Sequence, residues 1–184
     1  MKIVYYVLFY LTNCLSVPYR WAILDYLYRK TRESLARKLF RFTGKDAVIR
    51  PKLKISYLSE ISIGARSSLG DRNMIVAVGG LEIGTDVMIG PEVMILTQNH
   101  EITPIEEKLI EGKIQTKKVT IGDDVWIGAR VILLPGAKIG RGTVIAAGTV
   151  VPGKEYPENV VLGGNPAKII KQRNSVKLWE GKEY

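Results

Sequence analysis

An aliphatic side chain recurs at every sixth position through most of this 184-residue chain. A period of six matches neither the 3.6 residues of a helical turn nor the two-residue alternation of a strand. It is satisfied by short strands joined through tight turns, each strand directing one aliphatic side chain inward. Three such hexapeptides make one coil of a β-solenoid, and stacked coils share a continuous aliphatic core. The recurring residues are Ile63, Leu69, Ile75, Ile83, Ile89, Ile95, Ile121, Ile127, Leu133, Ile139, Ile145 and Val151.

All twelve of these positions hold Ile, Leu or Val, although the three types make up only 55 of the 184 residues, so the period is not a chance alignment. A glycine beside the inward aliphatic residue suits a turn whose backbone needs a positive φ or passes close to a neighbouring coil. The residue after the aliphatic position is glycine at Gly64, Gly70, Gly84, Gly90, Gly122, Gly128 and Gly140.

One long insertion interrupts the repeats. The motif "VTIG" at 119–122 repeats the earlier "LEIG" at 81–84 and "ISIG" at 61–64, so residues 101–118 leave the solenoid at one corner. An insertion of this length without a readable fold of its own is usually functional or disordered. It begins directly after His100, the only histidine of the chain, which we expect to be the last solenoid residue before the loop.

The repeat resembles that of the hexapeptide-repeat acyltransferases over about residues 49–173. Two stretches carry the likeness beyond the period itself: "DVWIGARVILLPGAKIG" at 124–140 and "VVLGGNPAKII" at 160–170. The resemblance implies a mainly β protein, a left-handed parallel β-helix, which is an exception to the usual right-handed crossover rule. It also implies a homotrimer with active sites between adjacent subunits.

The chain is accordingly expected to divide into three parts. Residues 1–48 form a basic, amphipathic helical segment, and residues 49–164 form the β-helix with its long loop. Residues 165–184 form an extension, in which Asn165 and Pro166 end the solenoid and lead into a short C-terminal helix or tail.

His100 is the candidate general base. A sugar hydroxyl attacks a thioester only when its proton is taken, and a free imidazole, which titrates at about pH 6.5, accepts that proton at neutral pH. In the enzymes that the chain resembles, a histidine at the exit of the long loop has this task, and His100 matches its place. A corner histidine that caps a turn is the competing interpretation. Asp71, Glu92 and Glu101 are candidates for orienting the ring.

Two amides are candidates for binding the acceptor. Asn73 and Asn99 could hold a sugar hydroxyl, or could form hydrogen bonds along the stacked coils. The sequence leaves both interpretations open.

The resemblance also implies that acetyl-CoA is the donor, with no metal required. Trp126 would line the pantetheine tunnel, although packing at a corner explains it equally well, and backbone near Ala129 would meet the thioester. Lys168 and Lys171 would meet the phosphates, with a solvated basic face as the alternative for Lys171. The full set assigned to acetyl-CoA is Trp126, Gly128, Ala129, Gly136, Ala147, Gly148, Lys168 and Lys171.

The net charge of +9 lies entirely in the N-terminal segment. Residues 1–54 carry 12 Lys or Arg against 3 Asp or Glu, and residues 55–184 carry 15 of each. Apolar residues at near-helical spacing from Leu24 to Phe42, with basic residues between them, predict a basic amphipathic helix. It could cap the first coil, join subunits, or lie on an anionic membrane surface, the last involving residues 1–45. No recognition motif for nucleic acid accompanies the charge.

The apolar run from Ile3 to Val17 is shorter than the roughly 20 residues of a spanning helix, and no signal-peptide cleavage site follows it. The single cysteine, Cys14, fits a reducing compartment. We expect a cytoplasmic protein, with the inner face of the membrane as a second placement.

The leading prediction is an acetyl-CoA-dependent O-acetyltransferase that modifies a sugar hydroxyl in surface polysaccharide biosynthesis. N-acetylation of an amino sugar, a nucleotide-sugar or an antibiotic stays open, because amines and hydroxyls can share one histidine. A non-catalytic solenoid scaffold is the third reading. Zinc carbonic anhydrases, which also use left-handed β-helix trimers, need three histidines at one interface, and one histidine per chain excludes them.

Overall fold

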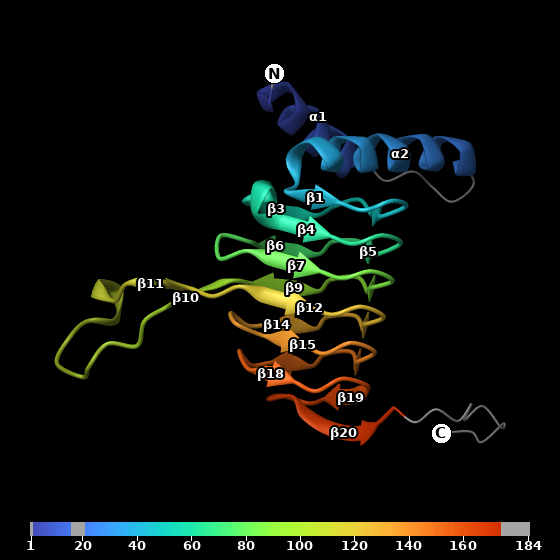
Figure 1. Cartoon of the computed structure of the whole chain (residues 1–184). Helices are drawn as coiled ribbons and strands as arrows, with labels where there is room; N and C mark the ends of the chain where they lie inside the picture. Colours follow the sequence, from blue (N-terminus) through green and yellow to red (C-terminus); the bar gives the residue numbers. More distant parts are fainter. Residues whose placement is uncertain (1, 16–20, 174–184) are drawn as a thin grey trace.

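The computed structural model describes residues 2–15 and 21–173, and most of them form a parallel β-helix of six stacked coils (Figure 1). Each full coil contributes one short strand to each of three parallel sheets, named here A, B and C in the order in which the chain visits them. This is the mainly β solenoid that the sequence predicts, because a strand of two or three residues is all that a six-residue repeat leaves between turns.

Sheet A contains β1 (Phe42–Thr43), β4 (Ile61–Ile63), β7 (Leu81–Ile83), β12 (Val119–Ile121), β15 (Lys138–Ile139) and β18 (Glu155–Tyr156). Sheet B contains β2 (Val48–Ile49), β5 (Ser68–Leu69), β8 (Met88–Ile89), β13 (Trp126–Ile127), β16 (Val144–Ile145), β19 (Val160–Gly163) and the antiparallel β20 (Lys168–Gln172). Sheet C contains β3 (Lys54–Ser56), β6 (Met74–Val76), β9 (Met94–Leu96), β14 (Ile132–Leu133) and β17 (Val150–Val151). A 3₁₀ turn, η2 (Leu58–Glu60), follows β3.

The recurring aliphatic residues all point into the solenoid, and none of the twelve is more than 4% exposed. They stack in register, as where Ile63 pairs with Ile83 and Ile83 pairs with Ile121. The predicted boundary at residue 49 falls inside the first coil, because β1 precedes it. At β1 the inward position is occupied by Thr43, so the aliphatic period is not visible there.

Tight corners connect the sheets, and we name them A–B, B–C and C–A after the sheets that they join. The glycine after each aliphatic residue serves close approach rather than a positive φ. At Gly128 an added Cβ would lie 2.6 Å from the Ala147 nitrogen of the next coil. The positive φ falls two residues after that glycine, at Arg130, where φ is 58°.

Two helices, α1 (Lys2–Cys14) and α2 (Ala22–Leu39), cover the open end of the first coil, and we call them the cap (Figure 1). Their buried side chains include Phe9 and Ala36, both fully inaccessible. The predicted helix is shorter than its apolar spacing indicated: Phe42 belongs to β1 and is exposed, and Leu27 also faces solvent. The solenoid end, rather than helical periodicity alone, therefore decides which residues are covered.

Buried polar groups tie the cap to the first coil. The Asn13 amide donates to the Leu53 carbonyl at 2.6 Å and accepts from the Leu53 N–H at 2.9 Å. Arg32, only 1% exposed, donates from Nε to the Ile49 carbonyl at 3.0 Å. Such contacts satisfy backbone groups that the terminal coil of a solenoid, here the first, otherwise leaves unpaired. Of the roles considered for this segment, covering the first coil is therefore one that the structure shows.

The long insertion is an antiparallel arm rather than an unstructured loop. Strands β10 (Gln98–His100) and β11 (Ile114–Thr116) pair along its base, and a 3₁₀ turn, η3 (Leu109–Glu111), lies beyond them. Figure 1 shows this arm, residues 98–116, projecting sideways from the middle of the stack.

The C-terminal extension begins as a strand, not as a helix. After the turn at Asn165 and Pro166 the chain runs back along β19 as β20 and covers the last edge of sheet B. Edge pairing satisfies the backbone groups of β19, which a departing helix would leave exposed. Of the predicted short helix or tail, residues 168–172 therefore form a strand rather than a helix, and residues 174–184 lie outside the described part of the chain.

Candidate active site

His100 lies on the arm, one short strand beyond the solenoid, and not in the last solenoid position as the sequence suggested. It pairs with Ile114 across the β10–β11 ladder. Thr97 fixes the branch point, because its Oγ1 donates to the Val76 carbonyl at 2.8 Å and accepts from the Gly79 N–H at 2.7 Å. The histidine backbone is therefore held in a hydrogen-bonded ladder whose base is anchored in the coil below.

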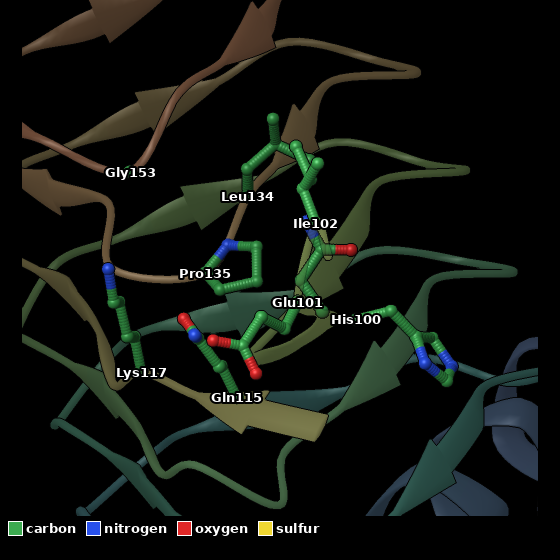
Figure 2. Close-up of a pocket in the computed structure, with 9 residues that line it drawn as sticks. His100, Glu101, Ile102, Gln115, Lys117, Leu134, Pro135 and Gly153 are labelled. Carbon is green, nitrogen blue, oxygen red and sulfur yellow. The ribbon is translucent and has the colours of Figure 1, made fainter. Parts of the chain in front are cut away.

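A pocket of about 470 Å³ adjoins the histidine. One wall is the base of the arm, and the other is formed by the C–A corners of the next two coils. Figure 2 shows the imidazole extending away from the side chains of Glu101 and Gln115. The ring is exposed. The lining residues are Asn99, His100, Glu101, Ile102, Gln115, Lys117, Leu134, Pro135 and Gly153.

The carboxylates predicted to orient the imidazole do not do so within one chain. Glu101, the residue directly after β10, points away from the ring. Asp71 and Glu92 lie in B–C corners, on the far side of sheet C from the histidine. Among the described residues, the three candidate carboxylates therefore do not make the orienting contact with the His100 ring that the sequence suggested.

A second pocket, of about 570 Å³, lies at the B–C corner. It brings together three of the predicted acetyl-CoA residues, Ala129, Ala147 and Gly148, which stack because they follow equivalent strands in successive coils. Neither the Ala129 nor the Ala147 N–H donates to another described residue, so two backbone donors remain available there. The lining residues are Arg72, Pro91, Glu92, Ala129, Arg130, Ala147 and Gly148.

Two arginines border this second pocket and share one carboxylate. Glu92 accepts from Arg130 Nε at 2.7 Å and from Arg72 Nε at 3.0 Å. These hydrogen bonds, that from Arg130 first, lower the pKa of Glu92 below its ordinary value. The cluster therefore stays net positive near neutral pH.

The other residues predicted to bind acetyl-CoA lie outside the B–C pocket. Gly128 is buried and its N–H already donates to the Ile145 carbonyl at 2.8 Å, so its part is to let the coils approach. Gly136 lies at the C–A corner, where an added Cβ would be 3.3 Å from Cδ of Lys117. It thus lies at the corner whose Leu134 and Pro135 line the His100 pocket. Trp126 is 52% exposed on the outer surface of sheet B.

Lys168 and Lys171 lie on β20, where they pair with Gly163 and Val161 of β19, and both are exposed. They lie on the strand that covers the last coil, one coil beyond Ala147 and Gly148. The structure therefore puts them on the same sheet and near the same end of the solenoid as the B–C pocket, without a direct contact to it.

The two candidate amides have different environments. Asn99 is exposed and lines the His100 pocket. Asn73 is fully buried, and its Oδ1 accepts from the Val93 N–H of the next coil at 2.9 Å. The acceptor-binding expectation is therefore wrong for Asn73, which forms the inter-coil hydrogen bond that was its alternative.

Sequence reasoning did not single out the pocket residues Ile102, Gln115, Lys117, Leu134, Pro135 and Gly153. A signal was present for the last three, because they occupy C–A corners in consecutive coils, directly beyond the point where the arm departs. Gln115 and Lys117 could not be placed without knowing that the arm pairs with itself.

Comparison with known proteins gives consistent results. Residues 118–153 match the family model described as bacterial transferase hexapeptide (six repeats). Galactoside O-acetyltransferase of Escherichia coli strain K12 is 36% identical over 144 residues, which cover 78% of this chain and 69% of that protein. A putative colanic acid biosynthesis acetyltransferase, WcaF, of the same strain is 31% identical over 169 residues, covering 88% and 89%.

Solved structures agree with these relatives. A hexapeptide-repeat-containing acetyltransferase from Vibrio cholerae O1 biovar eltor, complexed with acetyl coenzyme A, superposes with a TM-score of 0.76 and 26% identity. The match covers 90% of this chain and 84% of that one.

Proposed function

This chain belongs to the hexapeptide-repeat acyltransferases, and we propose that within this family it transfers an acetyl group from acetyl-CoA to a sugar hydroxyl, with His100 as the general base. The proposal rests on the two pockets, which present different chemical groups. The C–A corner offers the one imidazole of the chain, and the B–C corner offers backbone N–H groups that donate to no other described residue.

In the proposed reaction, one proton moves from the acceptor hydroxyl to His100 and then to the CoA sulfur. The imidazole of His100 takes the proton of the acceptor hydroxyl as its oxygen attacks the thioester carbonyl carbon. The tetrahedral intermediate then expels the CoA sulfur, which leaves as the thiol after the imidazolium returns the proton. The products are the acetyl ester and free CoA, and the histidine is restored.

The B–C pocket is the proposed donor site. The N–H groups of Ala129 and Ala147 have no partner among the described residues, and fixed backbone donors of this kind stabilise an oxyanion without reorganisation. Gly148 has a φ of +72° with nothing within 4 Å of its added Cβ, which leaves room for a ligand along the corner. Lys168 and Lys171 are the proposed partners of the CoA phosphates.

The two pockets of one chain cannot form a single site, because sheet C lies between their corners. We therefore propose that the imidazole of one subunit faces the B–C corner of its neighbour in a homotrimer. The arm supports this assembly: Ile102, Ile105 and Ile110 are each at least 85% exposed. Large apolar side chains on a projecting arm need a covering surface, and a second copy provides one.

A sugar acceptor fits the His100 pocket. The walls there present Asn99, Gln115 and Lys117 beside the apolar Leu134 and Pro135, a mixture suited to a ring with hydroxyls on its edges and C–H groups on its faces. Involvement in surface polysaccharide synthesis is supported by the likeness to the putative colanic acid enzyme, which spans nearly the full length of both chains.

The test is release of CoA from acetyl-CoA across a panel of sugars, amino sugars and nucleotide-sugars. His100→Ala is expected to lower kcat/KM for the accepted compound by about a hundredfold or more, with the Kd for acetyl-CoA unchanged. Thr116→Ala is the matched control, because Thr116 lies on the same ladder but does not line the pocket. Equal activity of the His100 variant would remove the histidine from the mechanism. Preference for an amino sugar, with acetyl found on nitrogen, would replace O-acetylation by N-acetylation.

A further inference from the structure

The cap buries one face against the first coil and leaves a large apolar face exposed. Isolated exposed apolar residues are ordinary, but a set gathered on two adjacent helices marks an interaction surface. Ile3 is 78% exposed and Ile23 is 80% exposed, so these side chains contribute nothing to capping. The exposed set on and between the helices is Ile3, Val4, Val7, Leu8, Tyr10, Leu11, Leu15, Trp21, Ile23, Tyr26 and Leu27.

Basic side chains are interleaved with these apolar ones. Lys38 Nζ lies 4.2 Å from the centre of the Tyr5 ring, and Lys30 Nζ lies 5.8 Å from that of Tyr26. Arg37 is exposed on the same helix. Cations beside aromatic rings, next to aliphatic side chains, are the composition of helices that lie in the headgroup region of a membrane.

From these contacts we infer that the outer face of the cap docks on an anionic lipid bilayer, with α1 and α2 lying on the surface. The helices do not cross it: α1 has 13 residues, and no helix in the described part of the chain is long and apolar enough to span a membrane. The apolar side chains enter the headgroup region while the lysines and arginines contact lipid phosphates.

Charge favours a bilayer over a second copy as the occupant. Residues 1–54 carry a net charge of +9 and the remaining residues a net charge of zero. Two caps placed face to face would bring two such segments together and repel each other. An anionic leaflet attracts them, and each Lys or Arg near its surface raises partitioning by about fivefold.

The test is flotation of the full-length protein with vesicles of phosphatidylcholine alone and of phosphatidylcholine mixed with phosphatidylserine. We expect binding to the mixed vesicles that weakens as salt rises. The double variant Arg37→Gln/Lys38→Gln should lower this partitioning by about tenfold or more. Its control, Arg141→Gln/Lys154→Gln, removes the same two charges at the far end of the solenoid, including a lysine that also lies over a tyrosine, Tyr156.

A second pair of variants isolates the apolar contribution. Ile3→Ser/Ile23→Ser should abolish most binding, whereas Met88→Ser/Ile170→Ser, also exposed but on sheet B, should leave it unchanged. Each variant is checked for an unchanged melting temperature, since all these side chains are exposed.

Three results would overturn the inference. The first is wild-type protein that does not float with anionic vesicles. The second is equal loss in the cap variants and their controls. The third is a cap variant that changes the oligomeric mass measured by light scattering, because the face would then join copies of the chain. None of these results depends on His100, so the docking surface and the proposed chemistry can fail separately.

Discussion

Mixing two inactive variants tests whether each catalytic site is shared between subunits. His100→Ala removes the base and leaves the B–C corner intact. Ala147→Trp does the reverse, because Ala147 is exposed and lines the B–C pocket of about 570 Å³, into which an indole would project. Each variant alone should be inactive, the first without general base catalysis and the second without donor binding.

The expected recovery follows from the proposed homotrimer. In a trimer, a working site needs an intact imidazole from an Ala147→Trp chain and an intact B–C corner from a neighbouring His100→Ala chain. Random assembly from equal amounts meets both conditions in about one quarter of the sites, so about one quarter of wild-type activity should return. A site built within one chain would return none.

The assay is CoA release after the two variants are produced together in one cell. As the blank, the two variants are purified separately and mixed under conditions in which their subunits do not exchange. Arg141→Trp serves as the control for the indole, because Arg141 occupies the equivalent exposed position at the A–B corner of the same coil as Ala147. It should remain active alone. Absence of recovery in mixed trimers whose composition is verified by mass would refute the shared site.

Two further predictions concern stability. Asn13→Ala should lower the free energy of unfolding by about 2–3 kcal/mol in denaturant titration, because the buried N–H and carbonyl of Leu53 both lose their partner. Thr31→Ala is the control and should cost far less, because the Thr31 hydroxyl donates to the Leu27 carbonyl of its own helix. Equal losses in the two variants would contradict this account. Gly128→Ala should lower the free energy of unfolding in the same titration by about 1–3 kcal/mol, because the new Cβ must displace the Ala147 backbone. A variant as stable as the wild type would show that the two coils can move apart there without cost.

The repetitive part of the fold was predictable because each coil repeats one local rule. The inward aliphatic residues and the stacked positions of Ala129 and Ala147 follow directly from a period of six. The same rule, applied to every coil, also places two of the candidate site residues. Asn73 occupies the inward slot that holds Val93 and Val131 in later coils, so it is buried, and Gly136 lies at a different corner from Ala147.

The non-repetitive parts were less predictable, because contacts distant in sequence decide them. The arm forms from short polar strands such as Gln98–His100, which have no hydrophobic alternation. Lys168–Gln172 becomes a strand because β19 presents an open edge, and nothing local favours that over a helix. None of the three carboxylates considered for orienting His100 lies beside its ring in the described part of the chain, because the corner that each occupies and the pairing of the arm decide where they lie.

The stacking of the coils sets the height of the His100 pocket above the cap. Strands in a sheet are spaced by about 4.8 Å, so the coils that line the His100 pocket lie roughly 10–20 Å from the first coil. One helix diameter of about 10 Å adds the thickness of the cap. With the cap resting on lipid, the imidazole stands at a fixed height of about 20–30 Å above the headgroups. A glycan growing from a lipid anchor would then be acetylated at the sugar that reaches this height, and distance from the anchor would select the residue as much as its chemistry does.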